Sequence, residues 1–206
     1  MVFKKFFHTV KADYHKPAHI DDEIASKTKW TSAVSGEKTF AGLKIKQIDN
    51  EKVYLVPTIF SSLFYSVFIF IGLALTYGGA KVDGYIRISL IIVGLVISIS
   101  MIYVLIKNLN IKIVFDKKSS QINFSNEKTL QLSNLHAIQI IPRLTRSSGE
   151  ASNYYFVYEL NLAFKGGERE NLMYHSGIDY LLHDASRLRD FLNIPVWQLK
   201  SISLDC

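Results

Sequence analysis

The chain has 206 residues, of which 49% are hydrophobic and 20% charged, and its formal net charge is +6. The positive charge is spread along the chain and forms no dense basic patch of the kind that nucleic acid requires, which excludes nucleic acid as a partner. The single cysteine, Cys206, excludes an intrachain disulfide and a cysteine metal cluster, and it fits a reducing compartment.

Residues 1–29 predict an N-terminal arm. They lack the continuous apolar core of about seven residues that a secretory signal needs. Apolar side chains recur at helical spacing among lysines between residues 2 and 10, so one interpretation is an amphipathic helix on an anionic membrane surface. The other is an arm that packs on the chain's own domain or is disordered. We predict no metal site and no cofactor, because Pro17 interrupts any helix that would align the nearby histidines, His8, His15 and His19.

Residues 30–57 predict a β-hairpin. Apolar and polar residues alternate over 43–48, Asp49 to Glu51 reads as a turn, and 52–56 resumes an extended pattern that ends at Pro57. A lone hairpin is marginally stable in water, so we expect it to pack on the domain that follows the membrane segment.

Two apolar runs, 58–80 and 88–106, predict a transmembrane helical hairpin over residues 58–106. At 1.5 Å per residue they make helices of about 34 and about 28 Å, which match a hydrocarbon core of roughly 30 Å. The connecting loop 81–87 carries Lys81 and Arg87 as its basic residues. Seven lysines flank the runs on the other side, so the positive-inside rule predicts that both termini are cytoplasmic. These lysines are Lys44, Lys46, Lys52, Lys107, Lys112, Lys117 and Lys118.

The interior of the two spans carries no ionisable side chain, which disfavours a transporter or a proton relay. Small residues recur at helix-packing spacing, Ser62 with Ser66 and Gly94 with Ser98. We expect these residues to pack the two helices of one hairpin together; a homodimer seam is the alternative.

Residues 107–206 predict a cytoplasmic α+β domain. Short alternating segments predict antiparallel strands, of which one ends at Pro142, and a polar loop covers 144–153. A helix over 179–192 closes the domain, with Asn193 as its left-handed cap. Strands followed by one C-terminal helix predict a fold like a pleckstrin-homology (PH-like) half-barrel. This likeness concerns only the order of the elements and does not identify a ligand.

The Gly166-Gly167 pair predicts a hairpin turn. A three-residue loop with glycine in the left-handed position favours the pairs Leu162–Leu172 and Leu160–Tyr174, and it sets Glu159 opposite His175. We interpret Glu159 and His175 as a cross-strand surface pair rather than an acid and base. Because the sequence also has no nucleophile elbow, phosphate loop or HExxH motif, we predict that the protein is not an enzyme.

Two groups of residues are candidates for binding. Arg143 and Arg146, with the backbone of Ser147 and Ser148, suit the geometry of an anionic lipid headgroup or a partner's acidic side chains. Tyr155 and Tyr180 lie off the predicted apolar faces, and if exposed they form a protein-binding patch.

The chain from about residue 30 resembles a group of small bacterial inner-membrane proteins of unknown function. The resemblance rests on the two spans and on several short motifs, and it implies a bacterial inner-membrane location without supplying a catalytic residue. The motifs are Gly36-Glu-Lys-Thr-Phe40, Pro57, Phe115-Asp-Lys117, Tyr158-Glu-Leu-Asn-Leu162, His175-Ser-Gly177, Asp184-Ala185 and Phe191-Leu-Asn-Ile-Pro-Val-Trp197.

We therefore expect a non-enzymatic protein in contact with membrane lipid, whose cytoplasmic domain binds another protein as a scaffold at the inner-membrane surface. One alternative is an immunity protein that blocks a membrane-targeting toxin with its hairpin. Another is sensing of anionic lipid headgroups through the two arginines.

Overall fold

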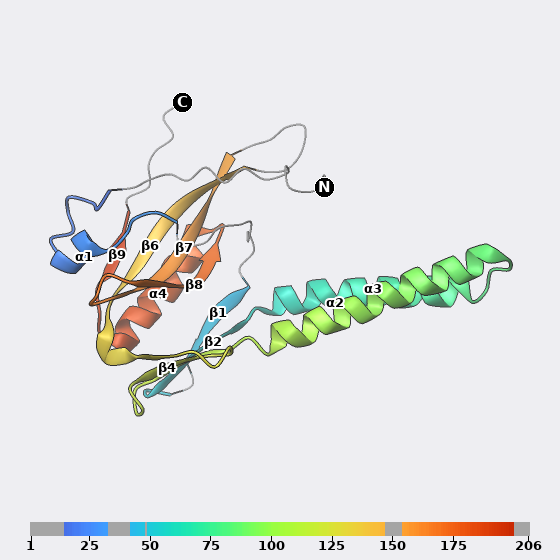
Figure 1. Ribbon diagram of the computed structural model, residues 1–206, viewed down its shortest axis with the longest axis horizontal. Helices are drawn as coiled ribbons and strands as arrows, with labels where there is room; N and C mark the ends of the chain where they lie inside the picture. The colour runs from blue at the N-terminus through green and yellow to red at the C-terminus, as the bar shows by residue number, and fades with distance from the viewer. Residues whose placement is uncertain (1–14, 33–41, 48, 147–153, 200–206) are drawn as a thin grey trace.

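A computed structural model describes residues 15–32, 42–47, 49–146 and 154–199, and shows two long helices that project from a β-rich domain (Figure 1). The elements in chain order are α1 (Glu23–Lys27), β1 (Leu43–Gln47), β2 (Lys52–Pro57), α2 (Ile59–Gly79), α3 (Tyr85–Leu109), β3 (Ile113–Asp116), β4 (Gln121–Phe124), β5 (Thr129–Gln131), the 3-10 turn η2 (Leu132–Asn134), β6 (Leu135–Arg146), β7 (Tyr154–Phe164), β8 (Arg169–His175), α4 (Ile178–Leu192) and β9 (Val196–Gln198).

The strands form two sheets. The first has the order β1-β2-β3-β4-β5 and is antiparallel throughout. The second has the order β8-β7-β6-β9, in which β9 runs parallel to β6. β2 pairs directly with β3, from Lys52 opposite Asp116 to Leu55 opposite Ile113, so the long helices are inserted between two neighbouring strands. Among the described residues the sheets stay open and do not close into a barrel.

One hydrophobic core joins both sheets to α4. Residues of alternate positions on the strands face inward, as the period of a pleated strand requires. α4 contributes Leu181, Ala185, Leu188 and Phe191, which lie on one face of the helix. Asn193 ends this helix in the left-handed conformation, at φ 55° and ψ 48°, which confirms the predicted cap. The strand side chains of this core include Ile45, Val53, Leu55, Ile113, Phe115, Ile122, Ile138, Ile140, Leu160 and Leu162.

α4 also protects the free edge of the first sheet. The carboxylate of Asp184 accepts a hydrogen bond from the backbone N–H of Ile45 at 3.3 Å, and Arg187 donates to the carbonyl of Ile45 at 3.1 Å. Ile45 lies on β1, which is an edge strand, so its outward backbone groups would otherwise need another partner. These contacts hold the strands that lead into the long helices against the C-terminal part of the domain.

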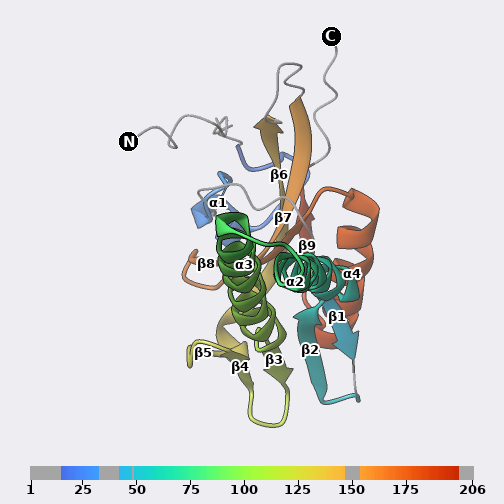
Figure 2. The same ribbon diagram turned by 90° about the vertical axis from the view of Figure 1, so that its right-hand side faces the viewer.

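The long helices pack along a seam of small residues, and Figure 2 views the pair from its free end. Gly72 and Gly94 are buried where the backbones come closest, because a Cβ on Gly72 would lie 2.7 Å from the carbonyl oxygen of Gly94. Ser98 is also buried in this seam and donates to the carbonyl of Ile69 at 3.4 Å. Gly94 and Ser98 therefore lie between the two helices of one hairpin, whereas Ser62 and Ser66 are half-buried nearer its base.

Both helices are long and apolar enough to cross a membrane. α2 matches the predicted run, while α3 begins before residue 88 and continues past 106, so the connecting segment is shorter than predicted. Nearly all of their large apolar side chains outside the seam are exposed.

The prediction that a strand ends at Pro142 is wrong, because β6 continues to Arg146. The backbone N–H of Ile138 donates to the carbonyl of Pro195, just before β9, at 2.9 Å. Because backbone groups alternate along a strand, the nitrogen of Pro142 points to the same side of β6. β9 ends opposite Ile140, so no ladder hydrogen bond is lost at Pro142. The predicted loop over 144–153 is accordingly strand at 144–146, and 147–153 lie outside the described residues.

The predicted β7–β8 register is also wrong, although its loop type is correct. Residues 165–167 form the turn, with Gly167 at φ 90° and a hydrogen bond from Phe164 N–H to the Glu168 carbonyl. This turn pairs Leu162 with Glu170, and a bulge near Leu172 then shifts the register so that Leu160 pairs with Met173. The bulge lets both Leu172 and Met173 be buried, which strict alternation would not allow.

Candidate interaction surface

β6 and β7 extend beyond the rest of their sheet as a two-stranded ribbon. β8 ends at His175 opposite Tyr158, whereas β6 and β7 stay paired as far as Arg146 and Tyr154. We call residues 143–146 and 154–157 the ribbon; it stands above the helical hairpin in Figures 1 and 2. Among the described residues no strand pairs with β7 on its outer side beyond Tyr158, and the even-numbered side chains of β7 share one face of the ribbon.

An aromatic stripe runs along this face from the tip of the ribbon to the start of α4. It consists of Tyr154, Phe156, Tyr158, His175 and Tyr180. The rings of Phe156 and Tyr158 are 6.3 Å apart, Tyr158 and His175 are directly opposite on neighbouring strands, and the rings of His175 and Tyr180 are 5.2 Å apart. Tyr154 and Tyr180, at the two ends, are 52% and 72% exposed, so the ends of the stripe are more exposed than its middle.

The stripe carries no charge at neutral pH. Burial lowers the pKa of His175 below its usual value, and this outweighs the opposing effect of Asp184 and of the Gly177 backbone. The Nδ1 atom of His175 accepts a hydrogen bond from Gly177 N–H at 2.7 Å, which the neutral ring with its proton on Nε2 allows. Burial also raises the pKa of Asp184, against its hydrogen bond from Ile45 and its basic neighbours Arg187, His183 and His175.

The opposite face of the ribbon is closed by a buried ion pair. The guanidinium of Arg143 lies 3.7 Å from the carboxylate of Glu159, with side-chain exposures of 2% and 0%. The hydroxyl of Ser32 donates to the same carboxylate. An isolated buried charge is strongly unfavourable, so the two side chains need each other, and the pair links β6 to β7 where the ribbon begins.

Figure 1 shows the second sheet at the end of the hairpin that joins the domain. Burial raises the pKa of Tyr174; Arg143 opposes the rise and Tyr65 on α2 adds to it. Tyr65 lies in the first two turns of α2. Tyr174 is the neighbour in β8 of His175, which lies in the middle of the stripe.

The buried polar groups continue across the second sheet. Arg169 donates to the side chain of Gln139 at 3.1 Å, and Gln139 donates to the carbonyl of Lys29 at 3.2 Å. Asn171 donates to Asn161 at 2.9 Å. Burial lowers the pKa of Arg169, and the charge of Glu159 partly offsets this effect. These contacts join three strands of the sheet to the N-terminal segment.

That segment, residues 15–32, crosses the outer face of the second sheet, and we call it the strap. Its Ile20, Ala25 and Trp30 pack on Ala137, Ala163 and Trp197 of the sheet. The two tryptophan rings are 6.1 Å apart, and the indole N–H of Trp30 donates to the carbonyl of Ala25 at 2.9 Å. The predicted arm 1–29 therefore packs on the domain from residue 15, while the proposed amphipathic stretch at 2–10 lies outside the described residues.

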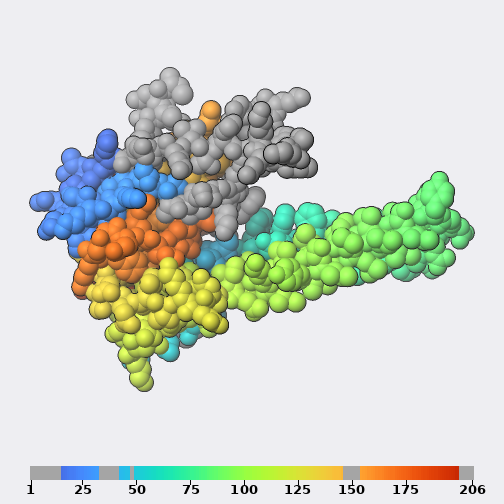
Figure 3. All heavy atoms as spheres, in the orientation of Figure 1, coloured from blue at the N-terminus to red at the C-terminus, as the bar shows by residue number. Residues whose placement is uncertain are grey.

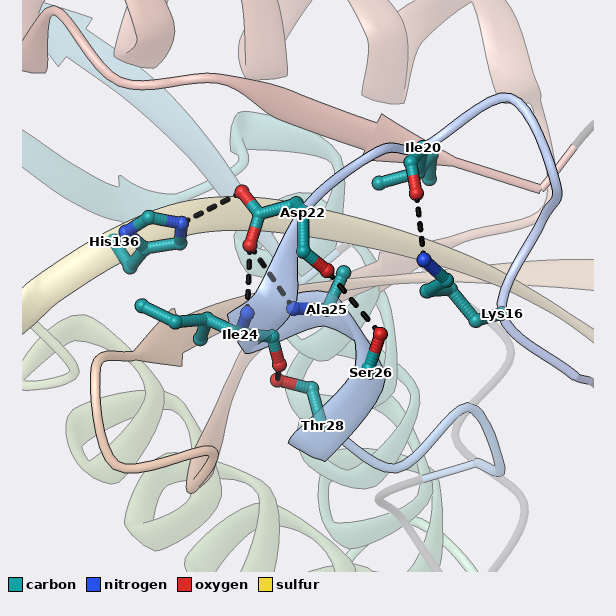
Figure 4. Close-up of polar contacts among 8 residues, drawn as sticks. All are labelled: Lys16, Ile20, Asp22, Ile24, Ala25, Ser26, Thr28 and His136. Carbon is teal, nitrogen blue, oxygen red and sulfur yellow. Dashed lines mark hydrogen bonds and ion pairs between the residues drawn. The ribbon is translucent and has the colours of Figure 1, made fainter.

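Asp22 links the strap to the sheet (Figure 4). Its carboxylate caps α1 by accepting hydrogen bonds from Ile24 and Ala25, and its second oxygen is 2.8 Å from Nε2 of His136 on β6. Burial alone would raise the pKa of Asp22, but the hydrogen bonds from His136, Ala25 and Ile24 together lower it. One carboxylate thus fixes both the short helix and its contact with the sheet.

The predicted binding residues do not come together. Arg143 precedes the predicted loop; it is buried in β6, where it pairs with Glu159. The side chain of Arg146 and all of Ser147 and Ser148 lie outside the described residues. Tyr155 is half-buried on the face opposite the stripe.

Tyr180 is exposed as expected, and its ring neighbour is His175, which lies opposite Tyr158 on β7. The alternation of the aromatics at 154, 156 and 158 is visible in the sequence. The end of β8 at His175, which leaves the ribbon without a third strand, is not.

The expected pair of Glu159 and His175 is also absent. Glu159 lies opposite Tyr174 and His175 opposite Tyr158, so the two side chains point to different faces of the sheet. Among the described residues, no group of three or more His, Cys, Asp or Glu side chains could hold a metal ion.

Comparison of the chain with protein families, with curated proteins and with solved structures finds no match.

Proposed function

We propose that this chain is a membrane-anchored protein-binding module. α2 and α3 cross the bacterial inner membrane as a hairpin, and the domain, with its PH-like element order, lies at the cytoplasmic face. Two observations support this placement: the length and apolar surface of the helices, and the seven lysines that flank their domain side. The bacterial origin rests on the resemblance described above.

The aromatic stripe carries the proposal. Tyrosine and phenylalanine bury a large area at small entropic cost and are enriched in protein interfaces. Here they form one uncharged surface that begins on the ribbon with Tyr154 and Phe156 and reaches the start of α4, at the end of the hairpin that joins the domain. The partner that fits is another polypeptide at the membrane surface, which presents apolar side chains to the stripe.

Site-specific photo-crosslinking in living cells tests the interaction. A photoreactive phenylalanine analogue replaces Tyr180 or Phe156, and the matched control replaces Tyr85, which is 83% exposed at the far end of the hairpin. We expect one protein adduct from both stripe positions and a different pattern from position 85. An adduct with twice the mass of the chain would make the partner a second copy, and no adduct from either stripe position would refute the proposal.

The topology has its own test. A cysteine at position 83, in the exposed segment between the helices, should react with a membrane-impermeant thiol reagent added to intact cells, while Cys206 should react only after lysis. Position 83 is preferable to Gly84, whose φ of 82° strains any other residue. Labelling of Cys206 from outside would reverse the proposed orientation.

A further inference from the structure

A cavity lies where the base of α3 meets the domain. Figure 3 shows the hairpin and the domain that it joins. Its volume is about 470 Å³. α3 supplies one wall, and the turn between β4 and β5 supplies the other. The lining residues are Tyr103, Ile106, Lys107, Asn110, Ile111, Ser125 and Asn126.

The cavity straddles the boundary between the apolar helix and the polar domain. Tyr103 and Ile106, which are 66% and 55% exposed, belong to the apolar run of α3. Lys107 is the first charged residue after that run. Asn110 and Asn126 add amide groups on the domain side. In a bilayer this order matches a lipid, whose acyl chain lies deeper than its phosphate.

The wall from the β4–β5 turn is held in place by Ser125. Its hydroxyl accepts a hydrogen bond from the backbone N–H of Lys112 at 2.6 Å and donates to the carbonyl of Lys112 at 2.9 Å. The turn is therefore fixed to the segment that leaves α3. Among the seven lining residues, Lys107 is the cation.

We propose that this cavity binds a phospholipid with an anionic headgroup from the inner leaflet. The acyl chain lies along Tyr103 and Ile106, Lys107 pairs with the phosphate, and the two asparagine amides bind headgroup oxygens. None of the seven lining residues is acidic, so nothing there complements the ammonium of a zwitterionic headgroup. The site needs the membrane insertion of the proposed function but is independent of any protein partner.

Native mass spectrometry of the full chain, released from nanodiscs of equal phosphatidylglycerol and phosphatidylcholine, tests the site. We expect wild-type protein to retain phosphatidylglycerol preferentially. Lys107→Gln should lower that retention about fivefold, as expected for one interfacial cation. Lys118→Gln, an exposed lysine on the β3–β4 turn, is the matched control and should retain lipid as the wild type does. Excess glycerol 3-phosphate should not displace the lipid, because it lacks the acyl chain.

A second variant separates the cavity from general surface charge. Asn126→Phe fills the cavity from the domain side without changing the charge, and it should lower retention as Lys107→Gln does. Equal retention of both lipids by wild-type protein, full retention by Asn126→Phe, or displacement by glycerol 3-phosphate would overturn the proposal. Resistance of each variant to alkaline carbonate extraction from the cell membranes used for the preparations shows whether the hairpin is inserted, so a failure of insertion is recognised as such.

Discussion

Removing one partner of the buried ion pair should destabilise the domain severely. At a separation of 3.7 Å, an effective dielectric constant of 20 gives an attraction of about 4 kcal/mol between Arg143 and Glu159. Glu159→Gln keeps the side-chain shape but leaves the charge of Arg143 in a site where it is 2% exposed. Breaking a buried pair in this way costs about 3 to 5 kcal/mol.

Thermal unfolding of the detergent-solubilised full chain measures this loss. The two tryptophans, Trp30 and Trp197, both lie at the contact of the strap with the second sheet, so their fluorescence follows this part of the domain. For a chain of this size the expected loss lowers Tm by about 6 to 20 °C. Glu168→Gln removes an exposed carboxylate from the neighbouring turn and should change Tm by no more than about 2 °C.

The double variant Arg143→Met/Glu159→Leu makes the reasoning refutable. Replacing both charges by apolar side chains of similar size leaves no uncompensated buried charge, so the double variant should be more stable than Glu159→Gln alone. The ion pair would not be what holds the ribbon if Glu159→Gln lowered Tm by less than about 2 °C, or if the double variant were no more stable than the single one.

Gly94→Ala should lower Tm by several degrees, because the added Cβ would lie 2.7 Å from the backbone nitrogen of Thr76. Gly78→Ala, where a Cβ meets nothing within 4 Å, should leave Tm unchanged. Equal effects of the two substitutions would contradict close packing of the two helices at Gly94. Asp22→Ala removes a helix cap worth about 1 kcal/mol and the contact with His136. Limited proteolysis should therefore cut the strap sooner than in wild-type protein. An unchanged rate of cleavage would show that Asp22 does not hold the strap on the sheet. The lowered pKa of His175 adds stability above the ordinary histidine pKa of about 6.5, and this stability is lost as pH falls through the folded-state pKa. Tm should therefore fall less between pH 7 and pH 5 in His175→Gln than in wild-type protein, and parallel falls would count against a histidine that is neutral in the fold.

Local patterns in the sequence predict most of the elements of this fold. Apolar runs, alternation, glycine turns and the Asn193 cap each depend on a few neighbouring residues. The interaction surface depends on distant ones. Whether Tyr154 and Phe156 are core or surface is decided by where β8 ends, and the burial of Arg143 depends on Glu159 and on Ser32, far away in the sequence. The bulge in β8 puts Glu159 and His175 on different faces of the sheet. It goes with the burial of two consecutive residues, Leu172 and Met173, and no periodic pattern in the sequence indicates that both are buried.

The insertion of the helical hairpin between β2 and β3 has a consequence for how the protein is made. β1 and β2 leave the ribosome before the apolar helices, but β3, the strand that pairs with β2, follows them. During translation β2 therefore lacks its partner β3 until both helices have been synthesised. In the membrane placement proposed above, the first sheet is completed only beside the site of insertion, so the order of synthesis would couple completion of the domain to entry of the hairpin into the bilayer.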